Sequence, residues 1–169
     1  MNSNFKPIRF LRWDELPDFD LYIDQMIQIV VDQLEDFSLF YEDTILSKSM
    51  VNNYVKKKIM PKPERKKYNK SHLSQLMVIT ILKPVLTMSE IQTAINVALK
   101  SNPNDKAYDL FCLSLETTYE WMWHLYHGEQ RQINLCEQGP FELAGLSLWG
   151  KYFTKQTILE QRKDFLNEQ

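Results

Sequence analysis

The sequence predicts an all-α protein, and three observations support that class. Only four glycines occur in 169 residues, whereas the helix-favouring residues Leu, Met, Gln, Glu and Lys are common. Apolar residues recur at helical spacing over several long stretches. Capping signals and prolines separate those stretches from one another. A chain of this length is sufficient for one sizeable core or two small ones.

The first helix is expected at about residues 20 to 36. Pro17 marks a turn before it, and Asp18 or Asp20 is placed to cap it. Apolar residues then recur on one side, so the acidic residues between them are expected to face solvent. The apolar positions are Tyr22, Ile23, Met26, Ile27, Val30 and Leu34.

A second helix is expected from Ser47 to about Lys58, followed by a stiff basic loop that we interpret as a small wing. Pro61 and Pro63 should end the helix, because proline cannot continue the main-chain hydrogen bonds. The apolar stripe of this helix consists of Met50, Val51, Tyr54 and Val55.

Two further helices follow the loop. Asn69 is a suitable N-cap for the third, which Pro84 should end. Thr87 and Glu90 form a capping box for the fourth, expected over residues 88 to 99.

A short polar segment, residues 101–104, separates two predicted domains, 1–100 and 101–169. The second domain is expected to be helical and buried on more than one side, because its apolar residues occupy more than one helix face. Gly128 is expected to end its first helix. One apolar stripe comprises Tyr108, Cys112, Leu115, Tyr119, Met122 and Tyr126.

Charge is distributed unevenly along the chain. Residues 48–70 contain nine basic side chains and one acidic side chain, whereas residues 1–47 have a net charge of −7 and residues 71–169 a net charge of −3. Positive charge of this density is typical of a surface that binds a polyanion. The alternative is a solvated charge run without a partner.

The order helix, turn, helix, basic loop, capped helix resembles the MerR-type winged helix-turn-helix. The matching positions are Val51, Tyr54, Ile59, Pro61, Lys67, Tyr68, Leu73, Leu76 and Ile79, with residues 86–91 resembling that family's short helix start. The sequence departs from the family pattern at Asn52 and Asn53, which replace an Arg-Tyr pair, and at Lys58, which replaces a Gly. The resemblance implies a fold of a DNA-binding type, and the departures leave the type of operator open.

Several stretches also resemble a YkrK-like domain-of-unknown-function family of Gram-positive bacteria. They are residues 21–25, 47–56, 61–63 and 66–68. The resemblance extends over about residues 10–100 and implies fold more than function.

The candidate DNA contacts are of two kinds. Asn on a recognition helix can pair with adenine in the major groove, although an ordinary solvated polar pair is the alternative. Basic side chains are expected to contact phosphates, which positions the protein without selecting a sequence. The predicted DNA-binding residues are Lys48, Asn52, Asn53, Lys56, Lys57, Lys62, Arg65, Lys66 and Lys67.

Two other groups have weaker functional interpretations. Glu116, Glu120, His124 and His127 lie at helical spacing, but metal sites usually take ligands from more than one element, so no metal or cofactor is expected. An aromatic group could line a pocket for a flat or cationic effector, and core packing with a dimer interface is the favoured alternative. This group comprises Tyr119, Trp121, Trp123, Tyr126, Trp149, Tyr152 and Phe153.

These observations predict a sequence-specific, DNA-binding transcription regulator that binds double-stranded DNA as a homodimer, with an effector that the sequence does not identify. The alternative is a protein-interaction or small-ligand-binding helical module without DNA binding. No enzyme is expected, because phosphate-binding loops, nucleophile elbows and metalloprotease motifs are missing.

The expected location is the cytoplasm, without a membrane partner. The N-terminus has no apolar secretory region, and no apolar stretch is long enough to span a bilayer. Cys112 and Cys136 are therefore expected to be reduced core residues.

Overall fold

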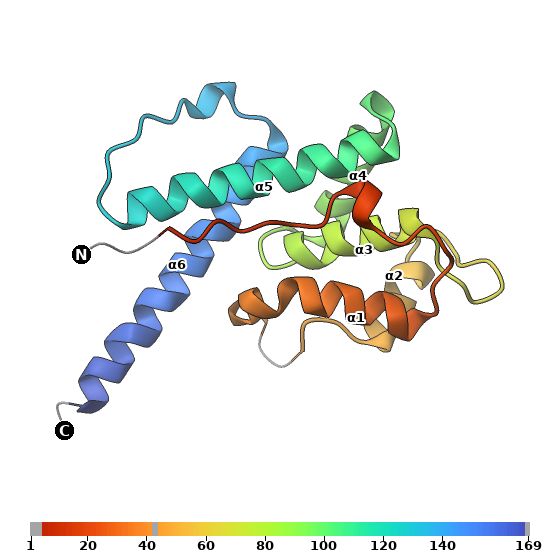
Figure 1. Ribbon diagram of the computed structural model, residues 1–169, viewed down its shortest axis with the longest axis horizontal. Coiled ribbons are helices and arrows are strands. Elements are labelled where there is room, and N and C mark those ends of the chain that lie inside the picture. The colour runs from red at the N-terminus through yellow and green to blue at the C-terminus, as the bar shows by residue number, and fades with distance from the viewer. Residues whose placement is uncertain (1–4, 42–43, 168–169) are drawn as a thin grey trace. The chain divides into compact units, whose positions relative to one another are not determined.

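The computed structural model describes residues 5–41 and 44–167, and within them the chain forms helices and no β-strand (Figure 1). The all-α prediction is confirmed. The α-helices are α1 Ile23–Leu34, α2 Lys48–Lys56, α3 Lys70–Leu82, α4 Met88–Ser101, α5 Asn104–Tyr126 and α6 Pro140–Asn167. The shorter 3-10 helices are η1 Trp13–Glu15, η2 Glu35–Phe40 and η3 Leu135–Glu137.

The chain divides into two compact units. The N-terminal unit comprises residues 9–113, and the C-terminal unit comprises residues 114–169 together with residues 1–8. The compact units divide inside α5, between residues 113 and 114, and not at the turn between α4 and α5. The first turns of α5 belong to the N-terminal unit, where Tyr108 and Cys112 are buried.

Helix α3 is the centre of the N-terminal unit, and α1 and α4 pack against it. Leu73, Leu76 and Ile79 are completely buried, because the helix is apolar on nearly every side. Asn69 is the N-cap as predicted, with its side-chain oxygen 3.2 Å from the amide nitrogen of His72.

Helix α1 begins later than expected, and neither Asp18 nor Asp20 caps it. Its N-cap is Tyr22, whose amide donates to the side chain of Gln25 at 2.9 Å. The reason lies one residue earlier, where Leu21 forms an antiparallel bridge with Tyr68 through two main-chain hydrogen bonds of 2.8 Å. That extended pairing prevents the helix from starting before Tyr22.

Helix α2 begins at the expected place, with Ser47 as its N-cap, but the prolines do not end it. The helix ends at Lys56, and Lys58 adopts a left-handed conformation with φ of 58°. The amide of Ile59 then donates to the carbonyl oxygen of Tyr54 at 2.9 Å, which closes the helix. Pro61 therefore lies beyond the end of the helix, which the left-handed residue Lys58 has already terminated.

The later boundaries agree more closely with the sequence. The predicted capping box of α4 is confirmed, since the Thr87 amide donates to Glu90 at 2.7 Å and the Glu90 amide donates back to the Thr87 hydroxyl at 3.3 Å. Gly128, with φ of 84°, follows the end of α5. Helix α6 extends to Asn167, well beyond the apolar residues that predicted it.

The C-terminal unit has an aromatic core between the end of α5 and α6. Trp149 is completely buried and donates from Nε1 to the carbonyl oxygen of Leu115 at 2.9 Å. The ring centroid of Tyr119 lies 5.0 Å from that of Trp149 and 6.1 Å from that of Phe153. These contacts agree with the core-packing alternative for the aromatic group.

Two further sequence expectations have a definite outcome. Both cysteines are free, but only Cys112 is buried, and Cys136 is exposed in η3, so the prediction of a core position for Cys136 is wrong. Among the described residues, none of the helices combines the length and the apolar character that a membrane crossing requires.

Candidate nucleic-acid interface

Helix α2 presents one polar face to solvent. Val51 and Tyr54 are buried against the N-terminal unit, whereas Asn52, Asn53 and Lys56 are exposed. Positions 53 and 56 lie one and four residues after position 52, so the three share the side of the helix opposite the buried pair. Two carboxamides and a cation are therefore available together on this face.

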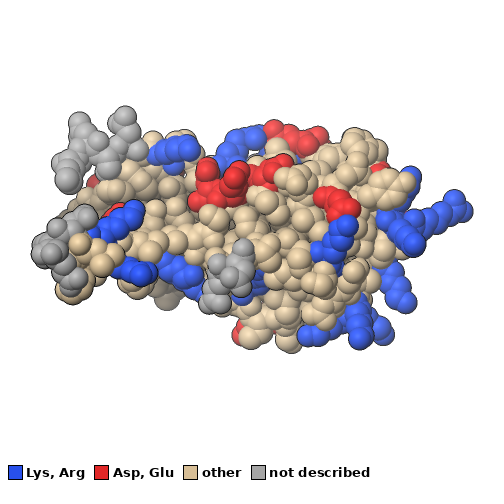
Figure 2. Space-filling view, turned by 90° about the horizontal axis from the view of Figure 1, so that it is seen from below, with Lys and Arg blue, Asp and Glu red and all other residues tan. Residues whose placement is uncertain are grey.

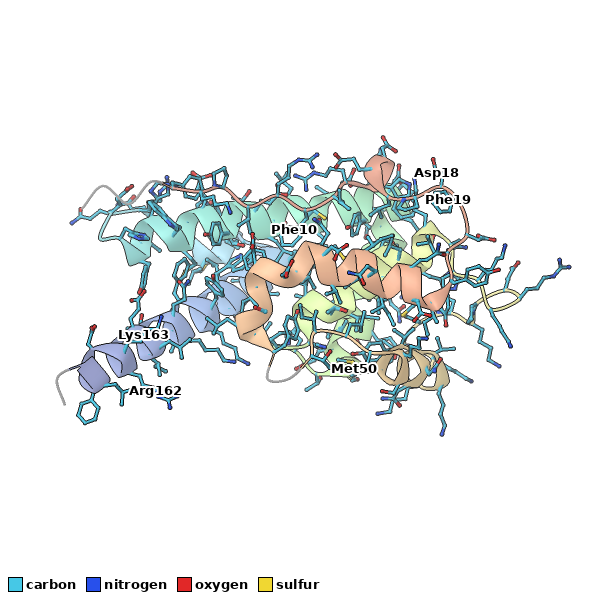
Figure 3. All side chains as sticks on the ribbon, turned by 60° about the horizontal axis from the view of Figure 1, so that its bottom comes forward. Phe10, Asp18, Phe19, Met50, Arg162 and Lys163 are labelled. Carbon is cyan, nitrogen blue, oxygen red and sulfur yellow. The ribbon has the colours of Figure 1, made fainter. Side chains whose placement is uncertain are left out.

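The loop between α2 and α3, residues 57–69, projects from the N-terminal unit (Figures 1 and 3), and the side chains of residues 64–67 at its tip are exposed. It contains a minimal hairpin, in which Glu64 and Lys67 pair and the Lys67 amide donates to the Glu64 carbonyl oxygen at 2.8 Å. Arg65 and Lys66 form the turn, both with positive φ, as in a type I′ turn.

Two tyrosines anchor this loop to the helices. Tyr54 and Tyr68 are 5% and 4% exposed, so both pack against the N-terminal unit. The main chain of Tyr68 pairs with Leu21, and burial raises the pKa of both tyrosine hydroxyls. The basic tip of the loop therefore projects from a buried base.

Basic residues occupy all the left-handed positions of the described chain other than Gly128. These positions are Lys58, Arg65 and Lys66, with φ of 58°, 47° and 65°. A left-handed conformation costs an L-residue about 1–2 kcal/mol, and Gly or Asn is favoured at both central positions of a type I′ turn. Positive charge is thus located where glycine would relieve conformational strain.

All of the predicted DNA-binding residues are exposed. Figure 2 shows Lys and Arg gathered at the right, where α2 and the basic loop lie. Six of these cations have no ion pair within residues 5–41 and 44–167. They are Lys56, Lys57, Lys62, Arg65, Lys66 and Lys67. Their charges are available to a polyanion.

The nine basic residues of positions 48–70 form a basic cluster. Acidic residues of the N-terminal segment form ion pairs with the first and the last of them. Lys48 pairs with Asp24 at 2.7 Å, and Lys70 pairs with Asp18 while its Nζ lies 5.6 Å from the ring centroid of Trp13. Lys48 is therefore less available to a polyanion than its position in the sequence suggests.

Two residues that contact the main chain of the loop were not predicted from the sequence. His72 on α3 is 6% exposed, with Nδ1 3.2 Å from the Asn69 amide nitrogen and Nε2 3.4 Å from the Lys62 carbonyl oxygen. Burial lowers the pKa of His72. Gln92 on α4 donates to the carbonyl oxygen of Lys58 at 2.8 Å. The position of His72, three residues after the N-cap Asn69, could have predicted its contact with Asn69. Nothing in the sequence linked Gln92 to Lys58.

A family model described as "Domain of unknown function (DUF1836)" matches residues 11–121. The chain belongs to this family. The DUF1836 region contains α1 to α4, the basic loop and most of α5. No curated protein and no solved structure matches the chain.

Of the candidate His and Glu residues, Glu116 and Glu120 lie within the DUF1836 region, whereas His124 and His127 lie beyond its end. His124 Nδ1 is 2.7 Å from Glu129, and Glu120 pairs with Arg131 at 3.3 Å. His127 Nδ1 lies 2.7 Å from the Trp123 carbonyl oxygen. In the part of the chain that the structure describes, no cluster of three or more His, Cys, Asp or Glu is arranged to hold a metal ion.

Proposed function

We propose that the protein is a DNA-binding transcription regulator with a MerR-like winged helix-turn-helix, of the YkrK-like kind and acting in the cytoplasm. In this proposal α2 is the recognition helix and residues 57–68 form a short wing. The observation that supports it most directly is the set of exposed cations without ion pairs on α2 and the loop. Their combined charge matches the phosphates of double-stranded DNA.

The two kinds of side chain have separate tasks in the proposal. The lysines and Arg65 hold α2 against the duplex by contacting phosphates on either side of the groove. Asn52 and Asn53 lie on the exposed face of α2, from which a carboxamide can pair with N6 and N7 of adenine.

Helix α1 supports α2 in an unusual way. A helix-turn-helix usually joins its two helices by a turn of about three or four residues. Here residues 35–47, which include η2, lie between α1 and α2, and yet the two helices pack together. The proposal therefore assigns DNA recognition to α2 and the wing, with α1 as a support.

A homodimer through residues 105–160 belongs to the same proposal. Leu110 and Leu113 are 48% and 53% exposed on α5, and Leu143 and Ile158 are exposed on α6. Apolar side chains of this size are typical of surfaces that a partner covers, and paired recognition helices bind two half-sites. Sedimentation of the full chain at tens of micromolar tests this, and a monomer under those conditions would overturn it.

The DNA proposal is tested by titrating the full chain with a pool of random duplexes at low salt, followed by selection of the bound sequences. We expect binding at low salt and enrichment of a defined site. A variant with Lys57→Glu and Lys66→Glu should lose affinity, whereas Lys100→Glu with Lys106→Glu, outside the basic cluster, should retain it. If no duplex binds at low salt, the proposal fails and the interaction or ligand-binding module replaces it.

A further inference from the structure

A cavity of about 390 Å³ lies behind the basic loop, within the N-terminal unit. Its walls come from the end of α2, from the following loop, from α3 and from α4. The α4 wall consists of one helix face, formed by Gln92, Ile95, Asn96 and Leu99. This volume lies within the range of about 300–1,000 Å³ that is usual for small-molecule sites.

The lining of the cavity is apolar with cationic and amide groups and no acidic group. Val55, Ile59 and Leu99 are among the apolar residues, and Lys58 and Lys62 supply the positive charge. Neither lysine has an ion pair within residues 5–41 and 44–167. An apolar wall with two unpaired lysines in the lining suits a ligand with an aliphatic body and one negative charge.

We propose that this cavity binds a small amphipathic anion, of the class of aliphatic carboxylates. The carboxylate lies near Lys58 and Lys62, the carboxamides of Gln92 and Asn96 donate to it, and the aliphatic body packs on Ile59 and Leu99. Charge-assisted hydrogen bonds to a carboxylate are the stronger contacts, so the charged end determines the orientation of the ligand.

The cavity also shares groups with the proposed DNA-binding surface. Val55 belongs to α2, and the side chain of Gln92 donates to the carbonyl oxygen of Lys58, which holds the left-handed end of that helix. A carboxylate competes for the same Gln92 amide. A carboxylate bound in the cavity therefore changes the affinity of the protein for DNA. This part of the inference rests on the proposed function.

The binding site is tested without DNA, by titrating isotope-labelled full chain with octanoate and following the side-chain amide signals by NMR. We expect the Gln92 and Asn96 signals to move in a saturable manner. The alcohol 1-octanol, which has the same chain without the charge, should bind at least about tenfold more weakly. If the two amide signals do not move, or if octanol binds as well as octanoate, the proposal is overturned.

Two variants locate the site. Leu99→Asp places a carboxylate against the ligand and should weaken octanoate at least about tenfold, and Lys62→Glu should do the same. Lys100→Glu, the next residue on α4 but outside the cavity, should bind octanoate as the unmodified chain does. Equal affinity in all three variants would overturn the assignment to this cavity.

The link to DNA has its own measurement. Octanoate should change the DNA affinity of the unmodified chain and leave that of Leu99→Asp unchanged, because Leu99 is not among the proposed DNA contacts. If octanoate binds and DNA affinity does not respond, the link is overturned while the ligand site stands. If no DNA binds at all, the proposed function fails, and the NMR titration alone decides the cavity.

Discussion

Gly145 on α6 lies directly against Thr118 on α5. A Cβ atom at position 145 would lie 2.3 Å from Thr118 Oγ1 and 3.2 Å from Thr118 Cβ. Thr118 is completely buried, and its hydroxyl donates to the carbonyl oxygen of Ser114 at 2.7 Å, so it has no room to move away. The absence of a side chain at position 145 therefore permits the close contact of the two helices within the C-terminal unit.

Gly145→Ala should destabilise the protein by about 1–3 kcal/mol, which is the usual cost of overpacking a core. The control is Gly150→Ala on the same helix, where the nearest atom to the new Cβ is 4.0 Å away. Alanine is favoured over glycine inside a helix by up to about 1 kcal/mol, so the control should be neutral or stabilising. Urea unfolding of both variants measures the difference, and equal stabilities would contradict the packing argument.

Replacing Lys66 and Lys67 together by Ala should reduce the salt dependence of DNA binding. Each phosphate contact contributes about 0.9 to the slope of log affinity against log salt, so the slope should fall by up to roughly two units on specific and random DNA alike. Lys67 also lies 5.7 Å from the ring centroid of Tyr22, so its single replacement should have the smaller effect. Lys100→Ala with Lys106→Ala is the control, and a similar slope for both pairs would count against the wing.

Asn52→Ala should behave differently, since the residue is uncharged. We expect an unchanged salt slope, a loss of about 1–3 kcal/mol on the selected site and almost no loss on random DNA. Titrations on both kinds of duplex measure it. If both affinities fall equally, α2 is not the recognition helix, although the fold is unaffected.

Replacing the two turn residues of the wing should raise the stability of the protein and lower its affinity for DNA. Arg65→Asn with Lys66→Gly places the residues that a type I′ turn favours at the two left-handed positions, and should stabilise the protein by about 1 kcal/mol. The same change removes two cations and should weaken DNA binding at low salt. Thermal unfolding and DNA titration of one preparation test both parts. Unchanged DNA affinity would show that the turn does not contact phosphates.

The buried imidazole of His72 should make stability depend on pH. Burial lowers its pKa below the ordinary value of 6.5, so the unfolded chain takes up the proton more readily. Its stabilising contribution is then complete above pH 6.5 and decreases as the pH falls through that value towards the lower pKa of the folded state.

Urea unfolding between about pH 7.5 and 5.5, above the range where carboxylates titrate, measures this effect. The unmodified chain should lose stability towards acid pH, and His72→Gln should lose less. A steeper slope for His72→Gln would contradict the assignment.

The sequence by itself determined those features that depend on neighbouring residues. Asn69 and Thr87 are N-caps as expected, and Ser47 lies at the expected start of its helix, because a cap involves contacts over only a few residues. The all-α class and the basic cluster were visible for the same reason, since periodicity and charge density are properties of short stretches.

Only the tertiary structure decided the features that join distant residues. The start of α1 depends on Leu21 pairing with Tyr68, and two of the basic residues are neutralised by Asp18 and Asp24. The hydrogen bond from Gln92 to Lys58 connects residues 34 positions apart. Local propensity contains no information about such contacts, because each becomes favourable only after the chain has packed α1 and α4 on α3 and brought the partners within hydrogen-bonding distance.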